Sequence, residues 1–245
     1  FDLEEGHSAN NPRLKRVKQP HQHTPFFWDI LKESKIENIL IDLLGKDISL
    51  KTSKLNTKAP GGGAAVEWHQ DWAFYPHTND NVLALGLMIN DVDLDNGPLM
   101  VIPKSHKGPV LSHNNNGVFC GAIDPNDKNF DISKAVTLTG KARSMTIHHA
   151  RTLHGSAPNN SNKDRLMLFY ECNSADAWPL VGVGAYLNNT NPIDLCNQME
   201  RQMLCGNVSY QPRMESVPVV LPLPPAPDYG SIFTTQKTGG AKSAF

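Results

Sequence analysis

The chain has 245 residues, of which 39% are hydrophobic, and its 23 Lys and Arg against 24 Asp and Glu leave a formal net charge of -1. This length fits one domain with a sizeable core, and the balanced charge provides no basic field that would attract nucleic acid. No apolar run approaches the roughly 20 residues that cross a bilayer. We therefore expect neither a nucleic-acid partner nor a membrane partner.

The four cysteines are irregularly spaced and form no C-x-x-C pair. This pattern favours reduced thiols over a disulfide framework, and it predicts a cytoplasmic protein. Nothing in the sequence indicates an oligomeric state.

The first part of the chain is expected to be helical. Thr24-Pro25 provides an N-cap followed by proline at the first helical position, and it introduces a predicted helix over 26–35. Apolar residues over 36–44 then repeat at i, i+3, i+4 and i+7, and Gly45 ends this second amphipathic helix.

The apolar pattern changes after this point to short, β-leaning runs. They lie at 48–56, 82–90, 99–103, 118–123, 142–150 and 166–172. Clusters of glycine, asparagine and proline separate them. Short strands with polar turns at this density predict a β-sandwich or jelly roll.

The C-terminal third has two recognisable segments. Asn191-Pro192 begins a predicted helix that runs through Leu204 and is stopped by Gly206. The proline-rich stretch 217–227 is expected to wrap the domain in an extended conformation.

We predict a single domain over residues 1–245. It is divided into a helical N-terminal part (about 1–47), a jelly-roll core (about 48–175) and a C-terminal helix with an extended tail (176–245).

The pair His69-x-Asp71 is the strongest functional signal in the chain. On an extended segment, residues two apart point to the same face. A second imidazole from a distant strand, His154, would complete a set of two histidines and one carboxylate. Such a set occupies one face of an iron(II) ion and leaves positions open for co-substrate and oxygen.

Arg165 lies eleven positions after His154. The run 145–156 is expected to be one strand that ends near His154, followed by a polar turn and a strand that starts near Arg165. Antiparallel pairing of these strands would bring the two side chains together, so the guanidinium could hold the carboxylate of an acid bound to the metal. On the same strand, His149 is expected to face the other way and to be structural.

These residues carry a resemblance. His69-Gln70-Asp71, Asp95-Asn96-Gly97-Pro98-Leu99, Ile102-Pro103-Lys104-Ser105-His106-Lys107-Gly108 and His154-Gly155-Ser156 followed by Arg165 stand in the order found in the phytanoyl-CoA dioxygenase family. The resemblance spans about 49–172. It implies an iron(II)- and 2-oxoglutarate-dependent oxygenase that uses O2 and has a mainly β fold with flanking helices, the double-stranded β-helix or jelly roll.

The resemblance also implies roles for individual residues. His69, Asp71 and His154 would ligate iron, and Arg165 would pair with the distal carboxylate of 2-oxoglutarate. Ser156 would hydrogen-bond the same co-substrate, and Ser53, on the strand over 51–56, is a further expected contact. Because a carboxylate stands at Asp71, hydroxylation is favoured over halogenation.

The expected reaction is hydroxylation of an unactivated C–H bond in a small-molecule substrate, with release of succinate and CO2. Trp72, Phe74, Tyr75 and the loop 112–117 are expected to line the entrance to the site. The chain offers no clear basic cluster for a CoA moiety, so the family name does not imply an acyl-CoA substrate.

Two other classes of protein fit the same residues. One is a non-catalytic jelly roll that binds a metal or a small ligand. The other is a zinc hydrolase, because two histidines and an aspartate can also hold zinc with an open water position. Neither alternative explains Arg165, and the hydrolase lacks a partner glutamate base.

Overall fold

The computed structural model describes residues 1–245 except 5, 33, 63, 181–191 and 220–230. Most of the predicted proline-rich tail, 217–227, therefore lies outside the described residues. Within the described residues, no helix is long and apolar enough to cross a membrane.

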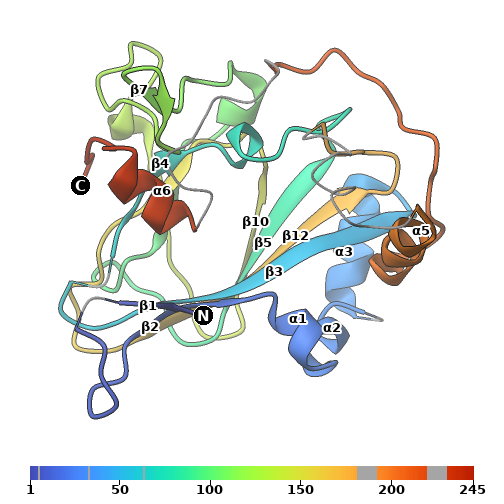
Figure 1. The fold of residues 1–245 in the computed structure, drawn as a ribbon. Helices are drawn as coiled ribbons and strands as arrows, with labels where there is room; N and C mark the ends of the chain where they lie inside the picture. Colours follow the sequence, from blue (N-terminus) through green and yellow to red (C-terminus); the bar gives the residue numbers. More distant parts are fainter. Residues whose placement is uncertain (5, 33, 63, 181–191, 220–230) are drawn as a thin grey trace.

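Two antiparallel sheets form the body of the molecule, which confirms the predicted jelly-roll class (Figure 1). The larger sheet has the strand order β1 (Asp2–Leu3), β2 (Leu14–Lys18), β3 (Ile48–Lys58), β12 (Arg165–Ser174), β5 (Val82–Met88) and β10 (Met145–His149), with β13 (Met203–Cys205) also paired to β3. The smaller sheet has the order β4 (Val66–His69), β11 (His154–Ser156), β6 (Leu99–Val101) and β9 (Val136–Leu138). β7 (Asn114–Asn115) and β8 (Val118–Phe119) form a separate hairpin.

The N-terminal helices cover the outer face of the larger sheet. They are α1 (Pro20–His23), α2 (Phe26–Asp29) and α3 (Lys35–Leu44). Ser34 caps α3 by accepting a hydrogen bond from the backbone N–H of Ile36, and Gly45 ends it with a φ of 90°. The predicted helix over 26–35 is shorter than expected, because the chain turns after α2 before α3 begins.

Strand alternation divides the larger sheet into a helix-facing side and a side that faces the smaller sheet. The helix-facing side chains join those of α3 in the main hydrophobic core, which contains Leu31, Leu40, Leu44, Ile48, Leu50, Leu83, Leu85, Leu168, Tyr170, Cys172 and Leu204. The Tyr170 hydroxyl donates a 2.5 Å hydrogen bond to the carbonyl of Phe27, which fixes α2 to β12. The helices cover only this side, so the side that faces the smaller sheet can line a site.

A second core lies beneath the smaller sheet, around Trp68 of β4 and Ile102, Leu111, Ile123, Phe130 and Leu153 from the loops. Short 3-10 turns connect these loops: η1 (Asp71–Ala73), η2 (Ser105–Lys107) and η3 (Ile132–Lys134). Trp68 precedes His69 on β4, so this core packs on the face of the smaller sheet opposite to the one that carries His69.

The expectation of one strand over 145–156 was wrong. β10 ends at His149, and a tight turn closed by a hydrogen bond from Thr152 N–H to the His149 carbonyl (2.8 Å) separates it from β11. The two strands lie in different sheets. β10 is mostly half-buried and β11 is buried, and the apolar pattern along the sequence does not reveal the crossing between them.

The C-terminal region also departs from the prediction. α5 (Pro192–Arg201) ends before Leu204, and β13 adds to the edge of β3. A further short helix, α6 (Ile232–Thr238), lies beside β4 (Figure 1). Its Gln236 bonds to both backbone groups of Glu67 and to the carbonyl of Gly121.

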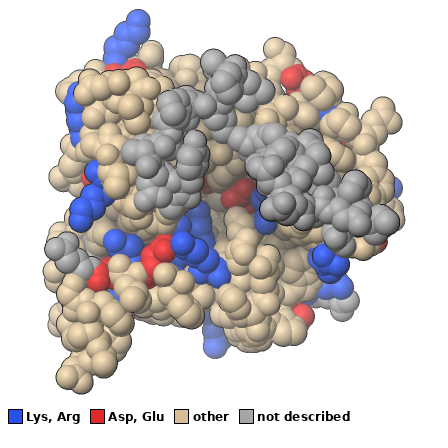
Figure 2. All heavy atoms as spheres, in the orientation of Figure 1, with Lys and Arg blue, Asp and Glu red and all other residues tan. Residues whose placement is uncertain are grey.

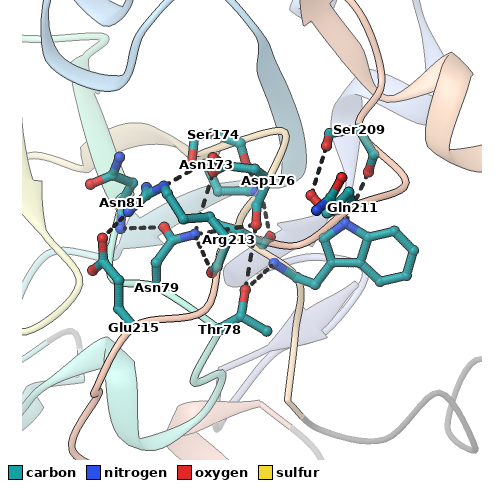
Figure 3. Close-up of polar contacts among 12 residues, drawn as sticks. Thr78, Asn79, Asn81, Asn173, Ser174, Asp176, Ser209, Gln211, Arg213 and Glu215 are labelled. Atoms are coloured by element: carbon teal, nitrogen blue, oxygen red, sulfur yellow. Dashed lines mark hydrogen bonds and ion pairs between the residues drawn. The ribbon is translucent and has the colours of Figure 1, made fainter.

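The segment around Arg213 is tied to the end of the larger sheet (Figure 3). The guanidinium contacts the Asp176 carboxylate at 2.9 Å, and the Arg213 carbonyl accepts from Asn79 Nδ2 at 3.1 Å. Glu215 N–H donates to the carbonyl of Thr78 at 2.9 Å. These bonds join the loop before β5 to the loop after β12.

Candidate metal centre and active site

His69, Asp71 and His154 meet between the two sheets. His69 ends β4, His154 begins β11, and the two are directly paired in the strand register. The His69 and His154 Nε2 atoms lie 3.5 Å and 3.8 Å from Asp71 Oδ1. The three ligand atoms lie within 4.8 Å of one another, and all three residues are buried. Residues 85 positions apart are thus assembled into the set that the sequence predicts.

Hydrogen bonds prepare both imidazoles for a metal. His69 Nδ1 lies 2.8 Å from the carbonyl of Glu67, and His154 Nδ1 lies 2.9 Å from the carbonyl of Thr152. A carbonyl only accepts, so each Nδ1 carries the proton and each Nε2 presents its lone pair toward Asp71. This donor set fits iron(II), with two neutral imidazoles and one carboxylate on one face.

The charges of the site agree with this reading. Burial opposes ionisation of Asp71, but the surrounding His154, His148 and His69 rings hold the pKa of its carboxyl well below the usual range. Burial, reinforced by His69 and His148, keeps the pKa of His154 well below its usual value. The site therefore presents an anionic carboxylate and an unprotonated His154, as metal binding requires.

Gln70, between the two ligands, points away from the metal and anchors this segment. It is fully buried. Its Nε2 donates to the carbonyls of Pro109 and Arg151, and its Oε1 accepts from Leu111 N–H. Its own N–H donates to His113 Nε2 at 2.8 Å. The sequence did not single out His113, because no local motif contains it.

One cavity contains the three metal ligands, Arg165 and Ser156. Arg165 is 3% exposed, and its Nε and Nη1 atoms have no hydrogen-bond partner. Burial lowers the pKa of its guanidinium to about 10, so it remains a cation at neutral pH. Arg165 belongs to β12 in the larger sheet, so it faces His154 across the sandwich rather than pairing with it in one sheet as expected.

Lys58 is a second buried basic residue that the sequence did not reveal. It pairs directly with Arg165 in the register of β3 and β12 and is 2% exposed. Its ammonium donates to Ser156 Oγ at 2.8 Å and to the carbonyls of Ser156 and Ala157. Burial, together with the nearby charge of Arg165, lowers the pKa of Lys58 well below its usual value. Lys58 thus fixes the position of the Ser156 hydroxyl.

Ser53 borders the same cavity, but its side chain points to the helix-facing side of the sheet. It pairs with Tyr170, whose ring lies in the helix-facing core. The Ser53 hydroxyl lies 2.6 Å from His21 Nδ1, so its side chain contacts α1 instead of Arg165.

Of the expected aromatic lining, Tyr75 borders the cavity, and Phe74 borders a second cavity that shares Asp71, Tyr75 and Glu171 with it. Trp72 does not. It is 1% exposed, packs against Val82 and Ala150, and its Nε1 donates to the carbonyl of Pro218. The loop 112–117 contributes no residue to the described lining of the cavity. The helix α6, which the sequence did not predict, contributes Ile232 and Phe233 instead.

The cavity is electropositive apart from two carboxylates. Among the described residues, its charged lining consists of Arg16, Lys54, Lys58, Arg165, Asp71 and Glu171. Figure 2 shows this face hollowed near its centre, with acidic atoms at depth and basic side chains beside them. Bound iron(II) would add further positive charge. The site is therefore suited to anionic ligands.

The family model for phytanoyl-CoA dioxygenase (PhyH) matches residues 7–167. The chain belongs to the phytanoyl-CoA dioxygenase family. It is 38% identical over 241 residues to a probable alpha-ketoglutarate-dependent hypophosphite dioxygenase from Stutzerimonas stutzeri, covering 97% of this chain and 80% of that protein. It is 28% identical over 183 residues to the ectoine dioxygenase of Stutzerimonas stutzeri (strain A1501), covering 66% of this chain and 59% of that protein.

Solved structures with the same fold include a non-heme alpha ketoglutarate dependent carbocyclase, SnoK from nogalamycin biosynthesis. The TM-score is 0.63 at 22% identity, covering 78% of this chain and 76% of that one. EctD from S. alaskensis, solved with 2-oxoglutarate and 5-hydroxyectoine, gives a TM-score of 0.57 at 23% identity, covering 68% and 58% of the two chains. These likenesses confirm the double-stranded β-helix.

Family membership and the assembled triad confirm the predicted class of enzyme. The protein is a 2-oxoglutarate-dependent non-haem iron dioxygenase with iron(II) as its metal. The two alternatives, a non-catalytic binding protein and a zinc hydrolase, are set aside.

Proposed function

We propose that this enzyme oxidises a P–H bond of a small phosphorus oxyanion, with hypophosphite as the first substrate to test. The observation that carries the proposal is the similarity to the hypophosphite dioxygenase over 97% of the chain, at 38% identity. The electropositive lining of the cavity supports it, because the site must accept an anionic substrate beside the dianionic co-substrate.

His69, Asp71 and His154 hold the iron in this proposal. Arg165 pairs with the distal carboxylate of 2-oxoglutarate, and its two unpartnered nitrogens support that role. Ser156, held by Lys58, donates its hydroxyl hydrogen to the same carboxylate. The Ser53 side chain is left out of the site because it bonds to His21.

When bound, iron(II) supplies the activation of O2, which the side chains alone cannot provide. One oxygen atom of O2 converts a P–H bond of hypophosphite into the P–OH bond of phosphite. The other enters the new carboxylate of succinate as 2-oxoglutarate loses CO2. Hypophosphite and the keto acid each give up two electrons, which together account for the four-electron reduction of O2.

The chain's own residues orient the reactants and exclude water. Arg165 and Lys58 fix the co-substrate at the deep end of the cavity, and the buried ligand set fixes the metal. Met167 and Phe169 of β12 and Phe233 of α6 border the same cavity with apolar surface. Exclusion of water by these walls strengthens the charge interactions within the site.

The test is turnover of hypophosphite by enzyme reconstituted anaerobically with iron(II) and then supplied with 2-oxoglutarate and O2. Phosphite and succinate are expected in equal amounts, measured by phosphorus NMR and chromatography. The Asp71→Ala variant should form neither. Succinate formation that does not respond to hypophosphite would contradict the proposal.

C–H hydroxylation of a small organic anion, the expectation from the sequence, is the second candidate. The apolar side chains of Met167 and Phe169 beside the metal ligands favour it, since they could contact a carbon skeleton. A panel of small carboxylates assayed for 2-oxoglutarate consumption under the same conditions separates the two.

A further inference from the structure

A row of side chains crosses the cavity face of the larger sheet beside the metal ligands. His148 of β10 pairs with Ala84 of β5, Ala84 pairs with Glu171 of β12, and Glu171 pairs with Thr52 of β3. Directly opposed residues in antiparallel strands share a face, and all four border the cavity. His148 and Glu171 therefore stand on either side of Ala84.

His148 is the exceptional histidine of this region. It is 7% exposed, and neither of its ring nitrogens has a hydrogen-bond partner among the described residues. The other buried histidines each place Nδ1 on a backbone carbonyl two residues earlier: His69, His77, His113 and His154. A buried polar group without a partner is destabilising. A partner from outside the chain would remove this penalty.

The His148 ring lies close to the metal site but outside the ligand set. Its Nε2 is 3.8 Å from Asp71 Oδ2, which is within ion-pair distance of that carboxylate but longer than a hydrogen bond, and its ring centroid is 4.4 Å from that of His154. The group of ligand atoms within 4.8 Å of one another contains His69, Asp71 and His154 without His148. His148 thus faces the space beside the metal.

On β5, Ala84 contributes a small side chain to the lining of this space. At Gly86, one step along the same face of β5, a Cβ atom would lie 2.7 Å from Thr146 Oγ1 and 2.9 Å from side-chain atoms of Met167 and Phe169. The neighbouring position is therefore already filled. On β5, the room for a ligand beside His148 is therefore over Ala84 rather than over Gly86.

Glu171 forms the other wall of this space. It is 6% exposed, and its carboxyl interacts with the hydroxyl of Tyr75. Burial, with a contribution from Asp71, raises the pKa of Glu171 to about 7. Because burial disfavours the charged form of Glu171, this wall is compatible with an anion alongside.

We propose that the floor above Ala84, between His148 and Glu171, is the binding site of the oxidised substrate, and that a His148 ring nitrogen donates a hydrogen bond to an oxygen of a small oxyanion. This inference rests on the proposed function. His148 is a substrate-binding residue here, distinct from the metal ligands and from the 2-oxoglutarate site at Arg165.

The test measures hypophosphite binding by calorimetry, using enzyme loaded with zinc(II) and 2-oxoglutarate so that no turnover occurs. His148→Phe removes both nitrogens and should raise the hypophosphite Kd ten- to hundredfold, as expected for a lost hydrogen bond to a charged group. His148→Gln keeps a donor and should stay within a few-fold of the wild type. Ala84→Val fills the floor and should abolish binding.

The matched control is His149→Phe on the same strand. His149 lies beside Asp80 and His106 and does not border the cavity, so hypophosphite binding should be unchanged. The visible charge-transfer band of the anaerobic iron(II) and 2-oxoglutarate complex should persist in every variant. Its loss in His148→Phe would overturn the inference in favour of a role in metal or co-substrate binding.

Two failures are distinguishable. If wild-type enzyme binds and oxidises hypophosphite but His148→Phe binds it equally well, the inference fails and the proposed function stands. If wild-type enzyme neither binds nor oxidises hypophosphite, the proposed function fails and the inference falls with it.

Discussion

Lys58 and Arg165 stand directly opposite each other on β3 and β12, and both are almost fully buried. Lys58 donates to Ser156 and to a neighbouring carbonyl, whereas two nitrogens of Arg165 have no partner. Among the described residues, no carboxylate lies within ion-pair distance of either. Two buried basic side chains that stand side by side would gain an ionic partner when a dicarboxylate binds between the sheets.

The first prediction concerns Arg165→Met. The lowered pKa of Arg165, about 10, corresponds to a penalty of roughly 3 kcal/mol for burying its charge. Replacing an unpaired buried charge with an apolar side chain is often neutral or stabilising. Without ligands, the variant should therefore unfold at the same urea concentration as the wild type or at a higher one. Adding 2-oxoglutarate should not raise its free energy of unfolding.

Under the same conditions, 2-oxoglutarate at about 100 times its Kd should stabilise wild-type enzyme by roughly 2.7 kcal/mol. Arg201→Met, at an exposed position in the last turn of α5, is the control and should retain that gain. A normal 2-oxoglutarate response in Arg165→Met would remove Arg165 from the co-substrate site.

The second prediction concerns Gln70→Leu. Leucine has a similar volume but leaves Leu111 N–H and the carbonyls of Pro109 and Arg151 without partners. Each buried unsatisfied group costs about 1–3 kcal/mol, so urea unfolding should show a loss of roughly 3 kcal/mol or more. Iron(II) affinity should also fall, because the segment between His69 and Asp71 loosens. Unchanged iron affinity would show that the neighbouring strands alone fix the ligands.

The third prediction is acid sensitivity from His77. This histidine is fully buried, and burial lowers its pKa to about 4, against about 6.5 in the unfolded chain. Between pH 6.5 and 4, His77 is protonated in the unfolded chain but not in the folded protein. The free energy of unfolding therefore falls by roughly 3 kcal/mol as pH decreases from 6.5 to 4. Urea unfolding of His77→Gln at pH 7.5 and 5 should show a flatter dependence than wild type.

The fourth prediction concerns Glu171, which should make the protein less stable as pH rises. The pKa of Glu171 is raised to about 7, against about 4.5 when unfolded. Between those values the unfolded chain releases a proton that the folded protein keeps, so stability falls as pH rises. In metal-free protein, Glu171→Gln should stabilise the fold by roughly 3 kcal/mol at pH 8 and by little at pH 4.5. An equal effect at both pH values would mean that Glu171 ionises normally.

The metal ligands were predictable because their signal is local. His69 and Asp71 lie two residues apart, and His154 stands in a short motif of its own. Their meeting needed only the fold class, which the density of short strands and turns indicated. The outward direction of Gln70 likewise followed from alternation along a strand.

The rest of the site depends on strand register, which the sequence does not contain. Lys58 faces Arg165 because β3 and β12 pair across more than a hundred residues. Alternation along β3 places Thr52 and Lys58 on one face of the sheet and Ser53 on the other. It does not say which face lines the cavity until one cavity-facing residue is known. The expectation of one strand over 145–156 also missed the crossing between sheets, which places His148 on β10 beside Ala84 of β5.

The histidine bond to the carbonyl two residues earlier has a kinetic consequence. It occurs at His77 and His113 as well as at the ligands His69 and His154, so it is a local property of the chain and needs no metal. Both ligand rings are therefore already oriented before iron arrives. Iron uptake in a stopped-flow mixing experiment should follow one concentration-dependent phase, set by encounter at the mouth of the cavity, with no slow rearrangement after it.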